Sequence, residues 1–290
     1  MCQRFQFLSE RPMIEKEKTE VLRLDVDSIL HTRIPRHYRF IPSSLIRWIE
    51  RTICQEEMNS LLLSNAGCRG ADFCNGVLRD LNITYTVYGE ENLPANGRSL
   101  FISNHPLGGL DGIILIDFIA SRYGDSLKFI VNDLLMAIEP LKDVFLPINK
   151  HGRQSRESSR SIDESFAGDE PIIIFPAGLC SRSQNGIVRD LTWQKTFVNK
   201  AIRYERPIVP LYFSGENSKS FYRFARWRKK SGLKLNIEMV YLPREVFRKK
   251  DAHFNIYIGN PIDYSTLKGG KEAQKTADNL KEIVYSLKRE

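Results

Sequence analysis

The stretch SLFISNHPLGGLDGIILI, residues 99–116, decides the fold of this chain. Residues 99–104 are a short apolar run with the length of a buried strand, two glycines follow, and residues 110–122 have the composition of a helix. A strand, a tight loop and a helix in succession are the unit from which α/β proteins are built. His105 and Asp111 lie beside this loop at the carboxyl end of the strand, where α/β folds place their functional groups.

The same alternation of strands and helices continues along the chain. Apolar, β-branched or alternating runs predict strands at residues 83–89, 99–104, 127–131, 144–148, 171–176, 207–213, 235–242 and 254–259. Helical spacing of apolar residues predicts helices at residues 41–63, 69–80, 110–122, 155–167, 192–204, 218–230 and 271–288, and a helix or turn at 133–141. The chain shows no internal repeat and no Gly/Ser linker.

These elements predict an α/β fold: a single domain with a central mixed, partly parallel sheet flanked by helices, preceded by an N-terminal helical extension. We expect the extension, with its amphipathic helices, to span residues 1–81 and the domain to span residues 82–290. With 290 residues, of which 42% are hydrophobic, the chain can fill one large core.

Composition excludes several classes of protein. No run of about 18 apolar residues occurs, and the N-terminal MCQRFQFLSERPMIEKEK is too charged for a signal peptide, so we expect neither a membrane-spanning segment nor export. The five cysteines form no CxxC pair, and no histidine has a metal-ligand partner at helical spacing. We therefore expect a reducing, cytoplasmic compartment, no disulfide framework and no metal site.

A formal net charge of +8 favours an anionic partner, such as a phosphorylated metabolite, an acidic lipid headgroup or a nucleic acid. In SKSFYRFARWRKKSGLKL, residues 218–235, Phe221, Phe224 and Trp227 recur at three-residue spacing among arginines and lysines. This pattern fits a helix at a membrane interface. It also fits contact with nucleic acid, or a surface helix whose aromatic rings pack on the sheet while the Arg stems lie along the surface.

The segment SNHPLGGLDG, residues 103–112, predicts a base with an orienting acid. Asp111 falls in the first turn of the expected helix, where the helix dipole favours an acid, and a folded loop would let it hydrogen-bond one ring nitrogen of His105. The other nitrogen would then serve as a general base, and Gly108 and Gly109 would permit positive φ angles or close approach of a substrate. The alternative is that Asp111 only caps the helix and His105 is satisfied by the backbone.

A second motif, PIIIFPAGLCSR at residues 171–182, repeats this architecture. A β-branched strand is followed by Pro176, Gly178 and a polar, cationic loop. Backbone amides after Gly178, together with Ser181 and Arg182, would bind a phosphate or another anionic group. The alternative is an ordinary strand-to-helix turn with a surface arginine.

Together, SNHPLGGLDG, IIIFPAGLCSR and RPIVPLYF (206–213) resemble the glycerolipid or lysophospholipid acyltransferase family over roughly residues 82–262. The resemblance implies transfer of a fatty acyl group from an acyl thioester, acyl-CoA or acyl carrier protein, to the hydroxyl of a lysolipid, with no further cofactor. His105 would be the general base and Asp111 its orienter. Arg182 would hold the anionic headgroup of the acceptor, and the family's middle block corresponds to FLPINKHGRQS (145–155). The substrate-binding residues that the resemblance implies are Asn104, Gly108, Gly109, Lys150, Arg153, Gly178, Ser181 and Arg182.

Two departures from the family pattern stand out. Five residues separate His105 from Asp111 where the family usually has four, and Ala177 replaces a common glutamate. Both features resemble the hemolysin-like branch of the family, whose relatives include acyltransferases that build amino-acid lipids, so the acceptor would carry a carboxylate instead of a phosphate. The implied partner is a membrane surface on its cytoplasmic side, and no nucleic acid is expected. The alternative is a non-catalytic, membrane-binding protein of the same fold.

Overall fold

The central feature of the molecule is a mixed β-sheet. The computed structural model describes residues 23–148, 156–184, 186–232 and 237–288, and seven strands of these residues form the sheet in the order β1-β9-β8-β2-β5-β3-β4. In chain order the strands are β1 (Thr84–Tyr88), β2 (Leu100–Ser103), β3 (Lys128–Asn132), β4 (Phe145–Ile148), β5 (Ile172–Ile174), β8 (Ile208–Phe213) and β9 (His253–Ile258).

Strand β2 lies at the centre of the seven-stranded sheet, within its parallel part. β8, β2, β5, β3 and β4 run parallel to one another, whereas β9 is antiparallel to β8, and β1 is parallel to β9. Leu100 of β2 is paired with Ile208 on one side and Ile172 on the other. The segments that follow β2, β5 and β8 therefore leave the sheet at the same edge, which brings the two sequence motifs together. The predicted α/β fold with a mixed, partly parallel sheet is confirmed.

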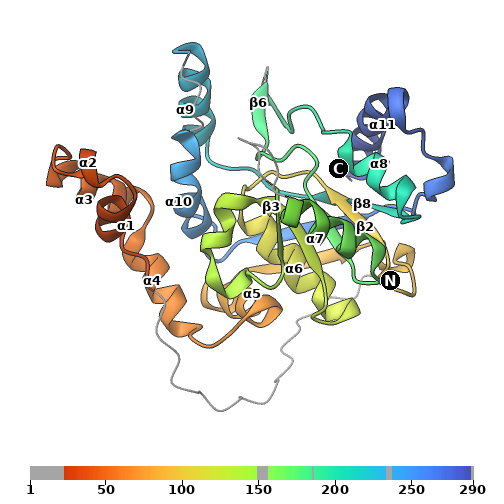
Figure 1. Cartoon of the computed structure of the whole chain (residues 1–290), viewed down its shortest axis with the longest axis horizontal. Helices are drawn as coiled ribbons and strands as arrows, with labels where there is room; N and C mark the ends of the chain where they lie inside the picture. Colours follow the sequence, from red (N-terminus) through yellow and green to blue (C-terminus); the bar gives the residue numbers. More distant parts are fainter. Residues whose placement is uncertain (1–22, 149–155, 185, 233–236, 289–290) are drawn as a thin grey trace.

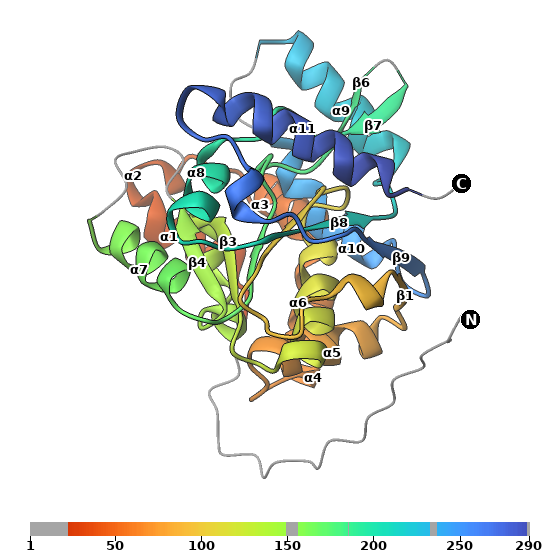
Figure 2. The ribbon, with the colours of Figure 1, turned by 90° about the vertical axis from the view of Figure 1, so that its right-hand side faces the viewer.

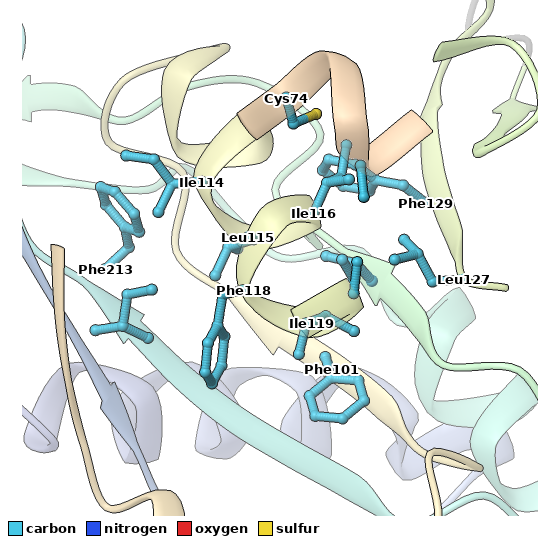
Figure 3. Close-up of a cluster of buried hydrophobic side chains, with 14 of the residues drawn as sticks. Cys74, Phe101, Ile114, Leu115, Ile116, Phe118, Ile119, Leu127, Phe129 and Phe213 are labelled. Carbon is cyan, nitrogen blue, oxygen red and sulfur yellow. The ribbon is translucent and has the colours of Figure 1, made fainter. Parts of the chain in front are cut away.

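Helices cover both faces of the sheet, because side chains alternate along each strand. On one face Phe101 packs with α5 (Gly70–Asp80) and α6 (Leu110–Tyr123); on the other, Leu100 and Ile102 pack with α7 (Arg156–Ala167), α8 (Thr196–Arg203) and α11 (Ala273–Ser286). Figure 2 shows α5 and α6 on the opposite side of the sheet from α8 and α11. In Figure 3, α6 lies between Cys74 of α5 and Phe101 of the sheet.

The N-terminal helices form an arm beside the domain (Figure 1). They are α1 (Val26–Arg33), α2 (Pro35–Tyr38), α3 (Ser43–Thr52) and α4 (Gln55–Ser64). The single helix expected at 41–63 is wrong, because Cys54 takes a left-handed conformation, with φ of 54°, that ends α3 and lets α4 start in a new direction. The side chain of Asn59 in α4 bonds both backbone groups of Leu24, which ties the arm together.

Residues 237–242, the described part of the segment 235–242, do not form the strand that its alternation predicts. Ile237–Tyr241 is a 3₁₀ turn that leads into α10 (Leu242–Phe247), beside α9 (Lys219–Lys230). Pro243 falls in the first turn of α10, where its fixed φ and missing N–H are tolerated. The alternation of apolar and polar residues is that of a half-buried strand. In the structure, however, the polar side chain of Glu238 points inward to two arginines from other parts of the chain, which alternation alone cannot reveal.

Short elements complete the described chain. A hairpin of β6 (Arg182–Gln184) and β7 (Ile187–Arg189), which the sequence does not predict, follows β5. The helix or turn expected at 133–141 is a pair of 3₁₀ turns, Asp133–Ala137 and Glu139–Leu141, and others lie at Glu90–Asn92, Tyr264–Thr266 and Gly270–Glu272. None of the described helices is long and apolar enough to cross a membrane.

Candidate active site

The imidazole of His105 and the carboxylate of Asp111 are in contact. Nδ1 of His105 lies 2.9 Å from Oδ2 of Asp111, which is fully buried in the first turn of α6. Among the described residues no group hydrogen-bonds to Nε2 of His105, and 14% of this side chain is exposed. The predicted pair therefore forms, and it leaves the second ring nitrogen available as a base.

The loop between them coils around the carboxylate of Asp111. Backbone N–H groups of Leu107, Gly109 and Gly112 donate to its two oxygens at 2.9 to 3.0 Å. Burial acts to raise the pKa of Asp111, but the charge and hydrogen bond of His105 and the backbone N–H groups outweigh it and hold the pKa below the ordinary 3.8. Asp111 is therefore ionised at neutral pH, so Nδ1 of His105 carries the proton that points at it.

Of the two loop glycines, only Gly108 needs to be glycine for its conformation. Its φ is +78°, and a Cβ there would lie 2.8 Å from Leu242 and 3.0 Å from Cys180. Gly109 has a φ of 179°, which any residue adopts, and a Cβ there would meet nothing within 4 Å. The extra residue between His105 and Asp111 is thus accommodated by the turn at Gly108.

The second motif packs against His105. The ring of Phe175, which follows β5, is stacked on the imidazole with centroids 3.9 Å apart and planes at 16°. The N–H of Ser181 donates to the backbone carbonyl of His105 at 2.7 Å. Gly178 has a φ of +62°, which turns the chain between these two contacts. The two motifs therefore form one structural unit.

The charge of Arg182 is directed inward. The residue is 9% exposed, and its guanidinium donates to the carbonyl and sulfur of Cys180 at 2.6 and 2.8 Å and forms an ion pair with Glu238 at 2.7 Å. Arg228 of α9 donates to both oxygens of the same carboxylate. Burial acts to raise the pKa of Glu238, but the two arginines hold it below its usual value. Two arginines thus share one buried acid, which leaves the cluster with a net positive charge.

Two other expected residues are also bonded within the protein. Asn104 is buried, and its amide bonds both backbone groups of Phe213, donating at 2.9 Å and accepting at 2.7 Å. This contact joins the end of β2 to the end of β8. The hydroxyl of Ser181 donates to Asp190 at 2.5 Å. Lys150 and Arg153 lie outside the described residues.

Sequence reasoning missed Asp190 and Glu238. Asp190 is buried between β7 and α8, accepts the backbone N–H of His105 at 3.2 Å, and accepts the indole N–H of Trp193 at 2.9 Å. The sequence carries one faint signal for it, an acid three residues before a tryptophan, since a buried indole N–H needs an acceptor. Glu238 has no such signal, because its partners come from distant segments.

A partly open cavity of about 550 Å³ adjoins both motifs on the α11 side of the sheet. Its lining includes Asn104, Pro106 and Ser181 from the motifs, and Arg189 and Tyr285 across from them. Arg189 forms an ion pair with Glu282 and lies over the ring of Tyr285 at 4.3 Å. The hairpin and α11 therefore close one side of the space that the motifs border.

Comparison with known proteins identifies the family of this chain. The acyltransferase family model matches residues 28–290. The lyso-glycine lipid O-acyltransferase of Bacteroides thetaiotaomicron is 40% identical over 264 residues, which are 91% of this chain and 97% of that protein. That of Phocaeicola vulgatus is 38% identical over 278 residues, 96% of this chain and 100% of the relative. The crystal structure of 1-acyl-sn-glycerophosphate acyltransferase from Thermotoga maritima aligns with 91% of this chain and 98% of its own, with 18% identity and a TM-score of 0.45. The family match and the identity to two full-length relatives show that this chain belongs to the acyltransferase family.

Proposed function

We propose that this acyltransferase moves a fatty acyl group from an acyl thioester to the hydroxyl group of a lyso-amino-acid lipid. The observation that carries the proposal is the contact between His105 and the buried, ionised Asp111, which leaves Nε2 as a base on a side chain that is 14% exposed. The acceptor class is supported by the two similar proteins that are named lyso-glycine lipid O-acyltransferases.

The chemistry follows from the geometry of the pair. Nε2 of His105 accepts the proton of the acceptor hydroxyl while the oxygen attacks the thioester carbonyl carbon. Asp111 stays ionised and stabilises the imidazolium that forms. The carbon–sulfur bond then breaks, and the departing thiolate takes the proton from the imidazolium. An ester and a free thiol result, and no covalent enzyme intermediate is needed.

The headgroup of such an acceptor is a carboxylate, a smaller anion than a phosphate. Ala177 is buried in the second hydrophobic cluster, so it offers no polar contact to a headgroup. Arg182 and Arg228 together leave a net positive charge after pairing with Glu238, which favours an anionic headgroup nearby. The absence of the glutamate contact at Ala177 favours a carboxylate-bearing acceptor over a phosphate-bearing glycerol.

The protein reaches its lipid substrate from a membrane surface on the cytoplasmic side, through an aromatic ladder made of Trp48, Tyr241, Phe224 and Trp227. Neighbouring ring centroids along the ladder lie 6.5, 5.0 and 5.7 Å apart, and both tryptophans are at least half exposed. Exposed basic side chains surround it on α3 and α9: Arg47, Arg51, Arg223, Arg226, Lys229 and Lys230. Aromatic rings flanked by Arg and Lys bind the headgroup region of anionic membranes.

Product analysis tests the proposed reaction. The purified protein is incubated with an acyl thioester, as acyl-CoA or acyl carrier protein, and with either a lyso-glycine lipid or a 1-acyl-glycerol phosphate. We expect mass spectrometry to detect the diacylated glycine lipid, and faster conversion of the glycine lipid than of the phosphate. Conversion of only the phosphate acceptor would overturn the acceptor class, and no conversion with either thioester would overturn the reaction.

A further inference from the structure

A second buried carboxylate, Asp190, lies behind the catalytic histidine. It is 1% exposed and follows β7. Its Oδ1 accepts from the backbone N–H of His105 and from the hydroxyl of Ser181, and its Oδ2 accepts from the indole of Trp193. Lys281 donates to the backbone carbonyl of Asp190 at 2.8 Å, and within the described ranges no cation forms an ion pair with the carboxylate itself.

Burying a carboxylate whose hydrogen-bond donors are all neutral costs folding free energy. Removing a carboxylate from water opposes folding unless its hydrogen bonds compensate. A hydrophobic or amide side chain would fill the same volume at lower cost. What the carboxylate offers is acceptor capacity on both oxygens, which lets one side chain hold three donors from three segments at once.

Two of these donors belong to the two catalytic motifs. The backbone N–H of Ser181 donates to the carbonyl of His105, and the Ser181 hydroxyl donates to Asp190. Asp190 also accepts the backbone N–H of His105. The backbone of His105 is therefore held on its N–H side and on its carbonyl side. Asp111 and Phe175 hold the imidazole ring. The ring and the backbone of the same residue thus have separate supports.

We infer that Asp190 is a positioning residue of the active site, which fixes the backbone of His105 and couples the second motif to the base. The inference rests on the proposed function. Asp190 does not touch the reacting atoms, so its loss would move His105 without removing a substrate contact. Displacements of about 1 Å at a catalytic group lower rates by about 10²-fold. The effect would therefore appear in kcat and not in KM.

Three variants of the full chain separate positioning from plain stability. Asp190→Asn keeps the volume but offers one acceptor oxygen in place of two. Ser181→Ala removes the hydroxyl bond from the second motif to Asp190 and keeps the backbone bond to the carbonyl of His105. Trp193→Phe, the matched control, removes a hydrogen bond of the same carboxylate on the side away from His105. For each variant we would measure kcat, KM, the thermal unfolding midpoint, and hydrogen exchange of peptides that contain residue 105.

We expect Asp190→Asn to lower kcat by about 10²-fold with KM within about twofold, and to speed exchange around His105. Ser181→Ala should also lower kcat and speed exchange around His105, but by less than Asp190→Asn. Trp193→Phe should lower the unfolding midpoint while kcat stays within about threefold of wild type. These results together would show that Asp190 supports the backbone of His105 independently of the contacts that hold its imidazole ring.

Several outcomes would overturn the inference. A folded Asp190→Asn protein with wild-type kcat would do so, as would a kcat loss in Trp193→Phe as large as that in Asp190→Asn. If Asp190→Asn does not fold, Ser181→Ala decides, and wild-type kcat in that variant rejects the inference. If the wild-type protein transfers no acyl group, the proposed function fails, whereas exchange around His105 still tests Asp190: unchanged exchange in Asp190→Asn rejects its role.

Discussion

Nδ1 of His105 lies 2.9 Å from Oδ2 of Asp111, although five residues separate them in the chain. The contact forms because Gly108 turns the loop and the loop N–H groups of Leu107 and Gly109 bond to the carboxylate. The contact between His105 and Asp111 is thus set by the conformation of the whole loop, and it forms with five intervening residues where the family usually has four.

His105→Ala is expected to remove acyl transfer and to leave the fold intact. Loss of the general base lowers the rate by on the order of 10² to 10⁴ or more. The backbone contacts of residue 105 to Asp190 and Ser181 do not involve its side chain, so they persist. Steady-state rates and thermal unfolding of the two proteins would be compared. Turnover near the wild-type level in this variant would refute the assigned role.

Asp111→Asn is expected to destabilise the protein at neutral pH, and this destabilisation is expected to become smaller in acid. The folded-state pKa of Asp111 lies below the ordinary 3.8, so the ionised group contributes stability that is complete above pH 3.8 and is lost as pH falls through the folded-state pKa. The difference in unfolding free energy between wild type and variant should therefore shrink below pH 3.8. Urea titrations at pH 7 and at several acidic values check this. A difference that is constant with pH would contradict it.

Glu238→Gln is expected to destabilise the protein by roughly 3 kcal/mol or more, because it leaves the buried charges of Arg182 and Arg228 without their acid. The matched control is Glu164→Gln in α7, which breaks an exposed pair with Arg160 and should change stability little. Urea unfolding of both variants measures the difference. Equal effects in the two would mean that the buried cluster is no more important than a surface pair.

The loop glycines provide a second matched pair. Gly108→Ala is expected to cost about 1–3 kcal/mol, since alanine is strained at a φ of +78° and its Cβ meets Leu242 and Cys180. Gly109→Ala should leave the unfolding free energy nearly unchanged, because the added Cβ has open space. Chemical unfolding checks both. A larger loss in Gly109→Ala than in Gly108→Ala would reject this view of the turn.

The aromatic ladder predicts where the protein meets a membrane. Replacing Trp48 and Trp227 together by serine is expected to weaken binding to vesicles of phosphatidylglycerol by roughly tenfold or more, because two exposed rings no longer enter the interface. Ile283→Ser is the control, since Ile283 is 40% exposed on α11, outside the ladder. Vesicle co-sedimentation measures both. Unchanged binding in the double variant would place the membrane contact elsewhere.

Local pattern predicted the elements that depend on neighbouring residues. The apolar runs at 99–104 and 171–176 and the alternation at 254–259 form strands, and 218–230 and 271–288 form helices close to the expected bounds. The continuous apolar runs of β2 and β5 are buried at every residue, whereas β9 buries alternate residues and α11 buries residues at helical spacing. The break at Cys54 escaped prediction, because nothing in the apolar spacing marks a residue that turns left-handed.

The sequence by itself determined the α/β class and the family, and it pointed to His105 and Asp111 as the proposed base and its acid, since each is written in short, contiguous motifs. Only the tertiary structure decided how the motifs work together. Arg182 meets Glu238 across 56 residues, and His105 meets Asp190 across 85, in contacts that form only when separate loops leave one edge of the sheet. Hydrogen bonds between such distant residues depend on where the strands are placed, and that placement comes from packing of the whole core.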